Sequence, residues 1–114
     1  MSMLTVIVPC YNEEKALPYF FPEIRKVANE LFATRNLSLE FLFVDDGSRD
    51  GTLELLREFA AEDDRARYIS FSRNFGKEAA MYAGFRHARG DYVVLMDADL
   101  QHPPAMLEEM YQAV

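Results

Sequence analysis

The sequence is poor in features that several common classes of protein require. Cys10 is the only cysteine, so no disulfide can form within the chain, and a reducing compartment is expected. Lysine and arginine form no cluster and the formal net charge is −7, which argues against nucleic acid as a partner. No apolar run approaches the roughly 20 residues of a membrane-spanning helix, and the first residues lack a signal-peptide pattern. The chain as given is therefore expected to be soluble.

Motifs of several well-known sites are also missing. No apolar run is followed by Gly-x-Gly-x-x-Gly, which argues against a Rossmann dinucleotide site, and no P-loop is present to cradle phosphates. His87 and His102 have neither the spacing of a zinc site nor that of a nucleophilic triad. Half of the 114 residues are apolar, which predicts one small globular domain with its own core.

Short apolar runs predict four strands, which occupy residues 4–8, 39–44, 68–72 and 92–96. Pro9 is expected to end the first strand, because proline has no backbone N–H for a sheet hydrogen bond. The runs are apolar throughout instead of alternating with polar residues. This pattern is typical of a parallel sheet that is covered on both faces.

Apolar residues at three-to-four spacing predict a helix after each strand. The first helix is expected over residues 16–32 and the third over residues 79–88, with Gly90 as its C-terminal cap. Asp50 is the expected cap of the second helix, and Pro103 opens the fourth. Four successive β-α units with right-handed crossovers form an α/β fold with an open, doubly wound, mainly parallel sheet.

Polar residues follow every predicted strand. The four loops read Pro9-Cys-Tyr-Asn-Glu13, Asp45-Asp-Gly-Ser48, Arg73-Asn-Phe-Gly-Lys77 and Asp97-Ala-Asp99. In open parallel sheets, ligands bind outside the carboxyl ends of the strands, where the strand order reverses. The loops therefore predict one polar site at one edge of the sheet.

The loop after the fourth strand suggests a metal site. Asp97 and Asp99 stand two residues apart where an extended segment ends, so both carboxylates can converge on one hard cation. Mg²⁺ or Mn²⁺ held in this way keeps open positions for substrate phosphates, which an acidic protein could not attract unaided. The alternative is a polar turn in which either aspartate caps the helix that begins near Pro103.

Seven motifs in order resemble those of family 2 glycosyltransferases. They are Ile7-Val-Pro-Cys-Tyr-Asn-Glu13, Phe43-Val-Asp-Asp-Gly-Ser48, Gly51-Thr52, Asn74-Phe-Gly76, Ala83-Gly84, Gly90-Asp91 and Asp97-Ala-Asp-Leu-Gln-His-Pro-Pro104. The closest similarity is to the polyprenyl-phosphate sugar transferases, the group of dolichol-phosphate mannose synthase and bactoprenol glucosyltransferase. The resemblance covers essentially the whole chain. It implies a GT-A fold of which residues 3–114 form the truncated, nucleotide-sugar-binding half.

The same resemblance implies roles for individual residues. Those expected to bind the nucleotide are Pro9, Tyr11, Glu13, Val44, Asp46, Asp97, Ala98 and Asp99. Those expected to hold Mn²⁺ or Mg²⁺ are Asp97, Asp99 and Gln101. Arg73 and Lys77 are candidates for neutralising the diphosphate, with solvated loop cations as an equal alternative.

The two aspartates after the second predicted strand have a structural alternative. Asp-Gly after a strand is a common turn signal, so Asp45 and Asp46 could serve a turn instead of a ligand. We favour ligand binding for Asp46 and leave both roles open for Asp45. Cys10 is interpreted as a packing residue.

The implied reaction is the inverting transfer of a sugar from a UDP- or GDP-sugar to a polyprenyl phosphate. It would take place at the cytoplasmic side of a membrane, in the synthesis of the cell envelope. The metal would stabilise the charge on the departing nucleoside diphosphate. No residue here matches a catalytic base of the family, and the acceptor-binding part is expected beyond Val114. The chain alone is therefore expected to be inactive and to self-associate through apolar surface that the missing part would cover.

Two other functions fit parts of the pattern. The first is a family 2 transferase with a polysaccharide or cell-wall acceptor, although the continuation Asp99-Leu-Gln-His-Pro-Pro104 favours a lipid phosphate. The second is a receiver-type signalling domain, which is also doubly wound and binds Mg²⁺ through carboxylates. A receiver has its acidic pair after the first strand, however, whereas Asp45 and Asp46 follow the second.

Overall fold

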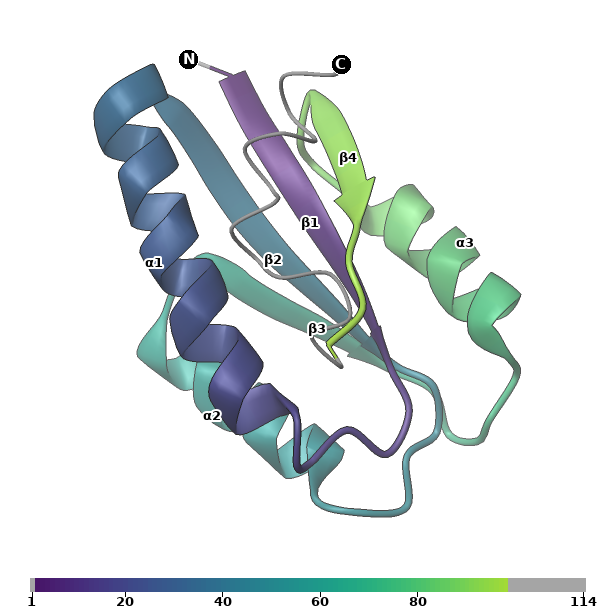
Figure 1. Cartoon of the computed structure of the whole chain (residues 1–114). Coiled ribbons are helices and arrows are strands. Elements are labelled where there is room, and N and C mark those ends of the chain that lie inside the picture. The colour runs from purple at the N-terminus through teal and green to yellow at the C-terminus, as the bar shows by residue number, and fades with distance from the viewer. Residues whose placement is uncertain (1, 99–114) are drawn as a thin grey trace.

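The computed structural model describes residues 2–98 as alternating strands and helices (Figure 1). The strands are β1 (Ser2–Cys10), β2 (Leu37–Asp45), β3 (Ala66–Ser70) and β4 (Tyr92–Leu95). The helices are α1 (Leu17–Arg35), α2 (Thr52–Glu62) and α3 (Lys77–His87). The predicted β-α alternation is confirmed as far as β4, and the helix predicted from Pro103 lies outside the described residues.

The described strands form one parallel sheet in the order β3-β2-β1-β4. The chain moves outward from β1 to β3 and then returns to pair β4 with the other side of β1. The order therefore reverses at β1, and the switch point lies at the carboxyl ends of β1 and β4. All four strands end at the same edge of the sheet, as the sequence predicts.

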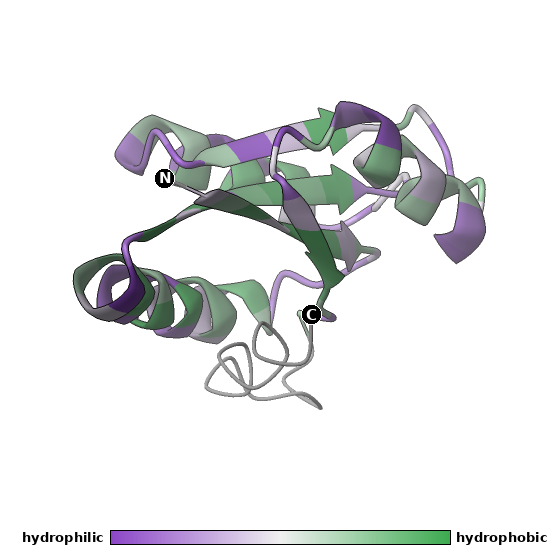
Figure 2. Ribbon diagram, turned by 90° about the horizontal axis from the view of Figure 1, so that it is seen from above, coloured by the Kyte–Doolittle hydropathy of each residue, from purple (hydrophilic) through white to green (hydrophobic). Residues whose placement is uncertain are grey.

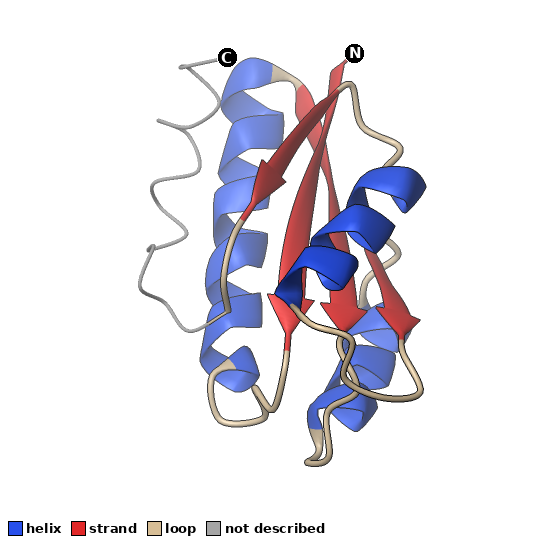
Figure 3. Cartoon of the chain, turned by 90° about the vertical axis from the view of Figure 1, so that its right-hand side faces the viewer, coloured by secondary structure: helices blue, strands red, loops and turns tan. Residues whose placement is uncertain are grey.

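The sheet has a core on each face. Leu4, Val6 and Val8 of β1 belong to the larger core, which α1 and α2 cover. Phe21 of α1 stacks on Phe59 of α2 in that core, with ring centroids 4.0 Å apart. Figure 3 shows α1 and α3 on opposite sides of the sheet, and Figure 2 shows that the strands between them are mostly hydrophobic. The two central strands are thus covered on both faces.

Helix α3 covers the second face at short range because its inner residues are small. Ala80 and Gly84 are buried, and a Cβ on Gly84 would lie 2.6 Å from Ile7 Cγ2. Ile7, Val44 and Ala80 form the smaller core on this side. These small residues bring the first turn of α3 to the ends of the strands.

The prediction that Pro9 ends the first strand is wrong. β1 continues to Cys10, and Pro9 pairs in register with Val44. β4 pairs with β1 only from Leu4 to Ile7, so Pro9 has a strand partner on one side only. A residue without a backbone N–H is tolerated where one side of a strand is unpaired.

Two predicted helix caps are also wrong. Gly51, not Asp50, is the N-cap of α2, although the Asp50 carboxylate accepts a hydrogen bond from the Thr52 amide at 3.0 Å. The C-cap of α3 is Ala88, in an extended conformation. Gly90 has a different role, since a Cβ there would lie 2.7 Å from the Thr5 amide nitrogen.

Within residues 2–98, no helix is long and apolar enough to cross a bilayer.

Candidate functional site

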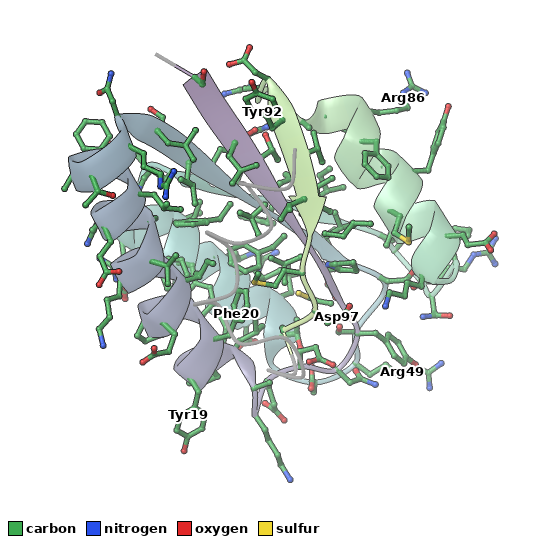
Figure 4. All side chains as sticks on the ribbon, turned by 45° about the horizontal axis from the view of Figure 1, so that its top comes forward. Tyr19, Phe20, Arg49, Arg86, Tyr92 and Asp97 are labelled. Atoms are coloured by element: carbon green, nitrogen blue, oxygen red, sulfur yellow. The ribbon has the colours of Figure 1, made fainter. Side chains whose placement is uncertain are left out.

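A cavity of about 300 Å³ opens at the carboxyl edge of the sheet, at the switch point. It is lined by residues from the end of β1, from the segments that follow β1, β2 and β4, and from the first turn of α3. These residues are Pro9, Cys10, Tyr11, Glu13, Asp46, Lys77, Ala80, Asp97 and Ala98. Figure 4 shows Asp97 just beyond the end of β4, at the edge where the loops gather.

Most of the residues predicted for the site line this cavity. Among the described candidates, two do not: Val44 is fully buried in the core beneath it, and Arg73 is exposed. The Arg73 guanidinium lies over the Phe75 ring, 5.1 Å from its centroid. Asp99 and Gln101 lie outside the described residues, so their places in the site stay predictions.

Two lining residues were not predicted as site residues. Ala80 reaches the cavity because small residues let the start of α3 lie close to the strand ends. Cys10 is 1% exposed, and its thiol lies 3.3 Å from the Val8 carbonyl oxygen. Burial, reinforced by the charges of Glu13 and Asp45, raises the pKa of Cys10 well above its ordinary value. The thiol therefore stays protonated at neutral pH, which agrees with a packing role.

The loops after β1 and β2 hold each other in place. The Asn12 amide donates to Ser48 Oγ at 2.9 Å, and the Arg49 amide donates to Asn12 Oδ1 at 2.8 Å. Next along the chain, the Glu13 amide donates to Thr52 Oγ1 at 2.8 Å. These reciprocal bonds fix the backbone on both sides of Asn12, and so place Tyr11 and Glu13 at the cavity.

Asp46 connects the loop after β2 to the loop before α3. Its Oδ1 accepts a hydrogen bond from the Phe75 amide at 2.8 Å, and its Oδ2 accepts bonds from the Gly76 amide at 3.0 Å and from Asn74 Nδ2 at 3.1 Å. Gly47, with φ +70°, lets the two loops touch, since a Cβ there would lie 2.2 Å from the Arg73 carbonyl carbon. A carboxylate has about four acceptor sites, so Asp46 keeps about one for a ligand.

Asp45 has a turn role in the structure. Its Oδ1 accepts a hydrogen bond from the Ser48 amide at 3.0 Å, and its Oδ2 lies 3.4 Å from Ser70 Oγ. The residue is 2% exposed and does not line the cavity. Of the two roles left open for Asp45, the structure therefore supports the turn.

The described residues fit part of a metal site. Between residues 2 and 98 there is no group of three or more His, Cys, Asp or Glu side chains that could hold a metal ion. Asp97, whose side chain is 32% exposed, presents its carboxylate to the cavity. Mg²⁺ and Mn²⁺ can be held by one or two carboxylates when substrate phosphates and water complete the coordination. The donor set therefore fits an ion that arrives together with a phosphorylated ligand.

Asp46→Asn is expected to weaken the binding of nucleoside diphosphates by about tenfold or more, because hydrogen bonds to a charged group are worth about 1.5–3 kcal/mol. Asn74→Ala is the matched control, since it removes one donor to Asp46 from a residue that does not line the cavity. Titration of UDP and GDP against both variants separates direct contact from loop anchoring. Equal losses in the two variants would show that Asp46 acts only by holding the loop.

Comparison with known proteins places the chain in a family. The sequence profile of glycosyl transferase family 2 matches residues 5–114. The putative glycosyltransferase CsbB of Bacillus subtilis (strain 168) is 44% identical over 108 residues, which are 95% of this chain and 32% of that protein. An undecaprenyl-phosphate 4-deoxy-4-formamido-L-arabinose transferase of Aeromonas hydrophila is 37% identical over 99% of this chain and 34% of its own length. The chain thus spans about one third of these relatives.

A solved structure of a glycosyltransferase has a similar fold. The mannosyltransferase PcManGT of Pyrobaculum calidifontis, in complex with GDP-Man and Mn²⁺, superposes with a TM-score of 0.70 and is 34% identical. The match covers 84% of this chain and 27% of PcManGT. The parallel sheet, the helices on its two faces and the cavity at its carboxyl edge correspond to the nucleotide-binding half of a GT-A fold. This chain belongs to glycosyl transferase family 2.

Proposed function

We propose that residues 3–114 are the nucleotide-sugar-binding part of a metal-dependent, inverting glycosyltransferase that uses a polyprenyl phosphate as acceptor. The observation that carries the proposal is the cavity at the switch point. It brings Tyr11, Glu13, Asp46 and Asp97 to one space. A nucleoside beside Tyr11 and Asp46 and a diphosphate near Asp97 would fill the site.

Each proposed role follows from the chemistry of the side chain. Tyr11 is 45% exposed and offers a flat apolar face on which a base or ribose can pack. The carboxylate of Asp46 can accept a hydrogen bond from a base N–H or a ribose hydroxyl. Asp97, with Asp99 and Gln101, would hold Mn²⁺ or Mg²⁺. Such an ion, when bound, stabilises negative charge on the diphosphate leaving group.

The acceptor is proposed from the relatives. A phosphate acceptor is already an anion at neutral pH, whereas an alcohol acceptor needs a general base. The Aeromonas hydrophila relative is named as a transferase to undecaprenyl phosphate. We therefore favour a lipid phosphate over a polysaccharide, and with it a place at the cytoplasmic side of the membrane for the full-length protein. Membership in family 2 removes the receiver hypothesis.

Nucleotide binding is tested by thermal denaturation with UDP and GDP, each with and without Mn²⁺ or Mg²⁺. A ligand at about ten times its Kd stabilises the folded state by about 1.4 kcal/mol. For a domain of this size the Tm should rise by about 5 °C or more. We expect this rise in Tm with one of the two nucleotides. It should occur only when Mn²⁺ or Mg²⁺ is present. A metal-independent rise, or none with either nucleotide, would contradict the proposal.

Transfer itself requires the acceptor side of the enzyme. Positioning two reactants contributes about 7–11 kcal/mol to lowering a barrier, so a chain that binds only the donor should show no measurable turnover. The measurement is sugar transfer from UDP- and GDP-sugars to a polyprenyl phosphate, with a full-length relative such as CsbB assayed beside this chain. Comparable turnover by the 114-residue chain would show that the site is complete within it.

A further inference from the structure

The charges around the cavity are unbalanced. Three of the described lining residues carry carboxylates, Glu13, Asp46 and Asp97, and Lys77 is the one cation among them. The amides of Phe75 and Gly76 and the side chain of Asn74 already stabilise the charge on Asp46 through hydrogen bonds. Lys77 pairs instead with Asp97, at 3.0 Å between Nζ and Oδ1.

The backbone before α3 fixes the position of the Lys77 main chain at the cavity. It is the first residue of α3, directly after Gly76, whose amide is bonded to Asp46 and whose φ is +103°. The Lys77 backbone is thus anchored at the cavity, while much of its side chain lies in solvent, with 62% of it exposed. An exposed ion pair contributes little net free energy, so its partners can be exchanged easily.

The ammonium group and a divalent cation would compete for Asp97. A metal ligated by the carboxylate would carry positive charge close to the ammonium group that Oδ1 now holds, and like charges that lie close together repel. A nucleoside diphosphate changes this balance because it brings new negative charge to the cavity. The lysine can then leave Asp97 and donate to a phosphate oxygen, where it acts as a mobile point charge.

We propose that Lys77 exchanges partners when the site is loaded. In the empty cavity it neutralises Asp97, and when a metal and a nucleoside diphosphate arrive it releases Asp97 to the metal and binds the diphosphate. Lys77 thereby opposes binding of the metal alone and supports binding of the metal with the nucleotide. The inference rests on the proposed metal–diphosphate site. It predicts that bound nucleotide increases the affinity for the metal ion. By thermodynamic linkage, the bound metal ion then increases the affinity for the nucleotide by the same factor.

The test is Lys77→Met, measured in two separate titrations. With Mn²⁺ alone, followed by the loss of its free electron paramagnetic resonance signal, the variant should bind about two- to fivefold more tightly than the parent, because an opposing charge is gone. With UDP or GDP in the presence of saturating Mn²⁺, followed by calorimetry, it should bind about tenfold more weakly. A change of opposite sign in the two titrations is the signature of partner exchange.

Two controls accompany this variant. Lys77→Arg keeps the charge and should resemble the parent in both titrations. Lys26→Met removes the same charge from an exposed position on α1 that does not line the cavity, and should alter neither. Circular dichroism of each variant checks that the fold is retained.

The outcomes separate this inference from the proposed function. Unchanged or weaker Mn²⁺ binding by Lys77→Met, with a parent that binds Mn²⁺ and nucleotide, would overturn partner exchange and leave the proposed function standing. Unchanged nucleotide affinity would overturn it as well, because the diphosphate would then not be the second partner. A parent that binds neither Mn²⁺ nor either nucleotide would overturn the proposed function and the exchange together.

Discussion

Replacing Asp97 by asparagine is expected to abolish the metal-dependent part of nucleotide binding while the domain stays folded. Asp97 lies two residues after the end of β4, its carboxylate lines the cavity, and its side chain is partly exposed. Asparagine has nearly the same size, so packing is preserved while the charge is lost. Mutation of groups that only orient a metal ligand commonly costs about 10–100-fold in affinity, and loss of a ligand should cost at least as much. Asp99→Asn is expected to have the same effect.

The measurement compares UDP and GDP affinity with and without Mn²⁺. In the parent, Mn²⁺ should increase the affinity, and in Asp97→Asn the two values should coincide. Asp64→Asn is the control, because Asp64 is an exposed aspartate that does not line the cavity. If Mn²⁺ enhances nucleotide binding equally in Asp97→Asn and the parent, Asp97 is not a metal ligand.

Replacing Glu40 by alanine is expected to reduce the free energy of unfolding by about 3 kcal/mol or more. Its carboxylate is buried beside the amino-terminal half of the central strand β2. It accepts hydrogen bonds from Thr5 Oγ1 at 2.7 Å, from Arg67 Nε at 2.7 Å and from the Arg89 amide at 2.9 Å. Removal of one partner of a buried ion pair typically costs about 3–5 kcal/mol. We expect a loss at the lower end of this range because the Arg67 side chain is 27% exposed and water can reach it.

Urea denaturation measures this effect, and Glu40→Gln serves as a second variant. Glutamine keeps an oxygen for Thr5 or the Arg89 amide but removes the charge that faces Arg67. Its loss of stability should therefore be smaller than that of the alanine variant. Wild-type stability in Glu40→Ala would show that Arg67 and Thr5 find equivalent partners without the carboxylate.

The same carboxylate gives the stability a dependence on pH. Burial raises the pKa of Glu40, but hydrogen bonds from Thr5, the Arg89 amide and Arg67, with the Arg67 charge, outweigh burial and lower the pKa below its ordinary value of 4.5. The stabilisation is complete above the pKa of the unfolded state and is lost as the pH falls through the lower pKa of the folded state. The difference in free energy of unfolding between the parent and Glu40→Gln should therefore be largest near neutral pH and decrease below about pH 4.5. A difference that stays constant to about pH 3 would exclude this cause.

The sequence predicted the fold and much of the site because both depend on local patterns. Apolar runs that end in polar residues placed Tyr11, Asp46 and Asp97 at one edge of a parallel sheet, where the cavity lies. The errors arose where long-range contacts decide the structure. Pro9 continues β1 because β4 ends before reaching it, and Gly90 is required by its approach to Thr5 rather than by the end of a helix.

Glu40 shows what local patterns cannot reveal. It lies within an apolar run that predicts a buried strand, yet its carboxylate connects β1, β3 and the segment before β4. Its partners Thr5, Arg67 and Arg89 are 35, 27 and 49 positions away in sequence. Only the order of the strands brings these residues together, so no spacing in the sequence indicates the cluster. The second role of Asp46, as the anchor of the loop before α3, is hidden for the same reason.

The return of the chain from β3 to the far side of β1 has a consequence for how the site forms. β1, β2 and β3 pair between successive units, but β4 pairs with a strand near the other end of the described chain, as in Leu4 with Tyr92. Closing so long a loop is entropically costly and slows folding, so β4 is expected to dock last. The loops that carry Tyr11 and Asp46 are then in place before Asp97 reaches the cavity. A ribosome that has released only the first three β-α units would carry an incomplete site, and the proposed metal ligand would arrive with the fourth strand.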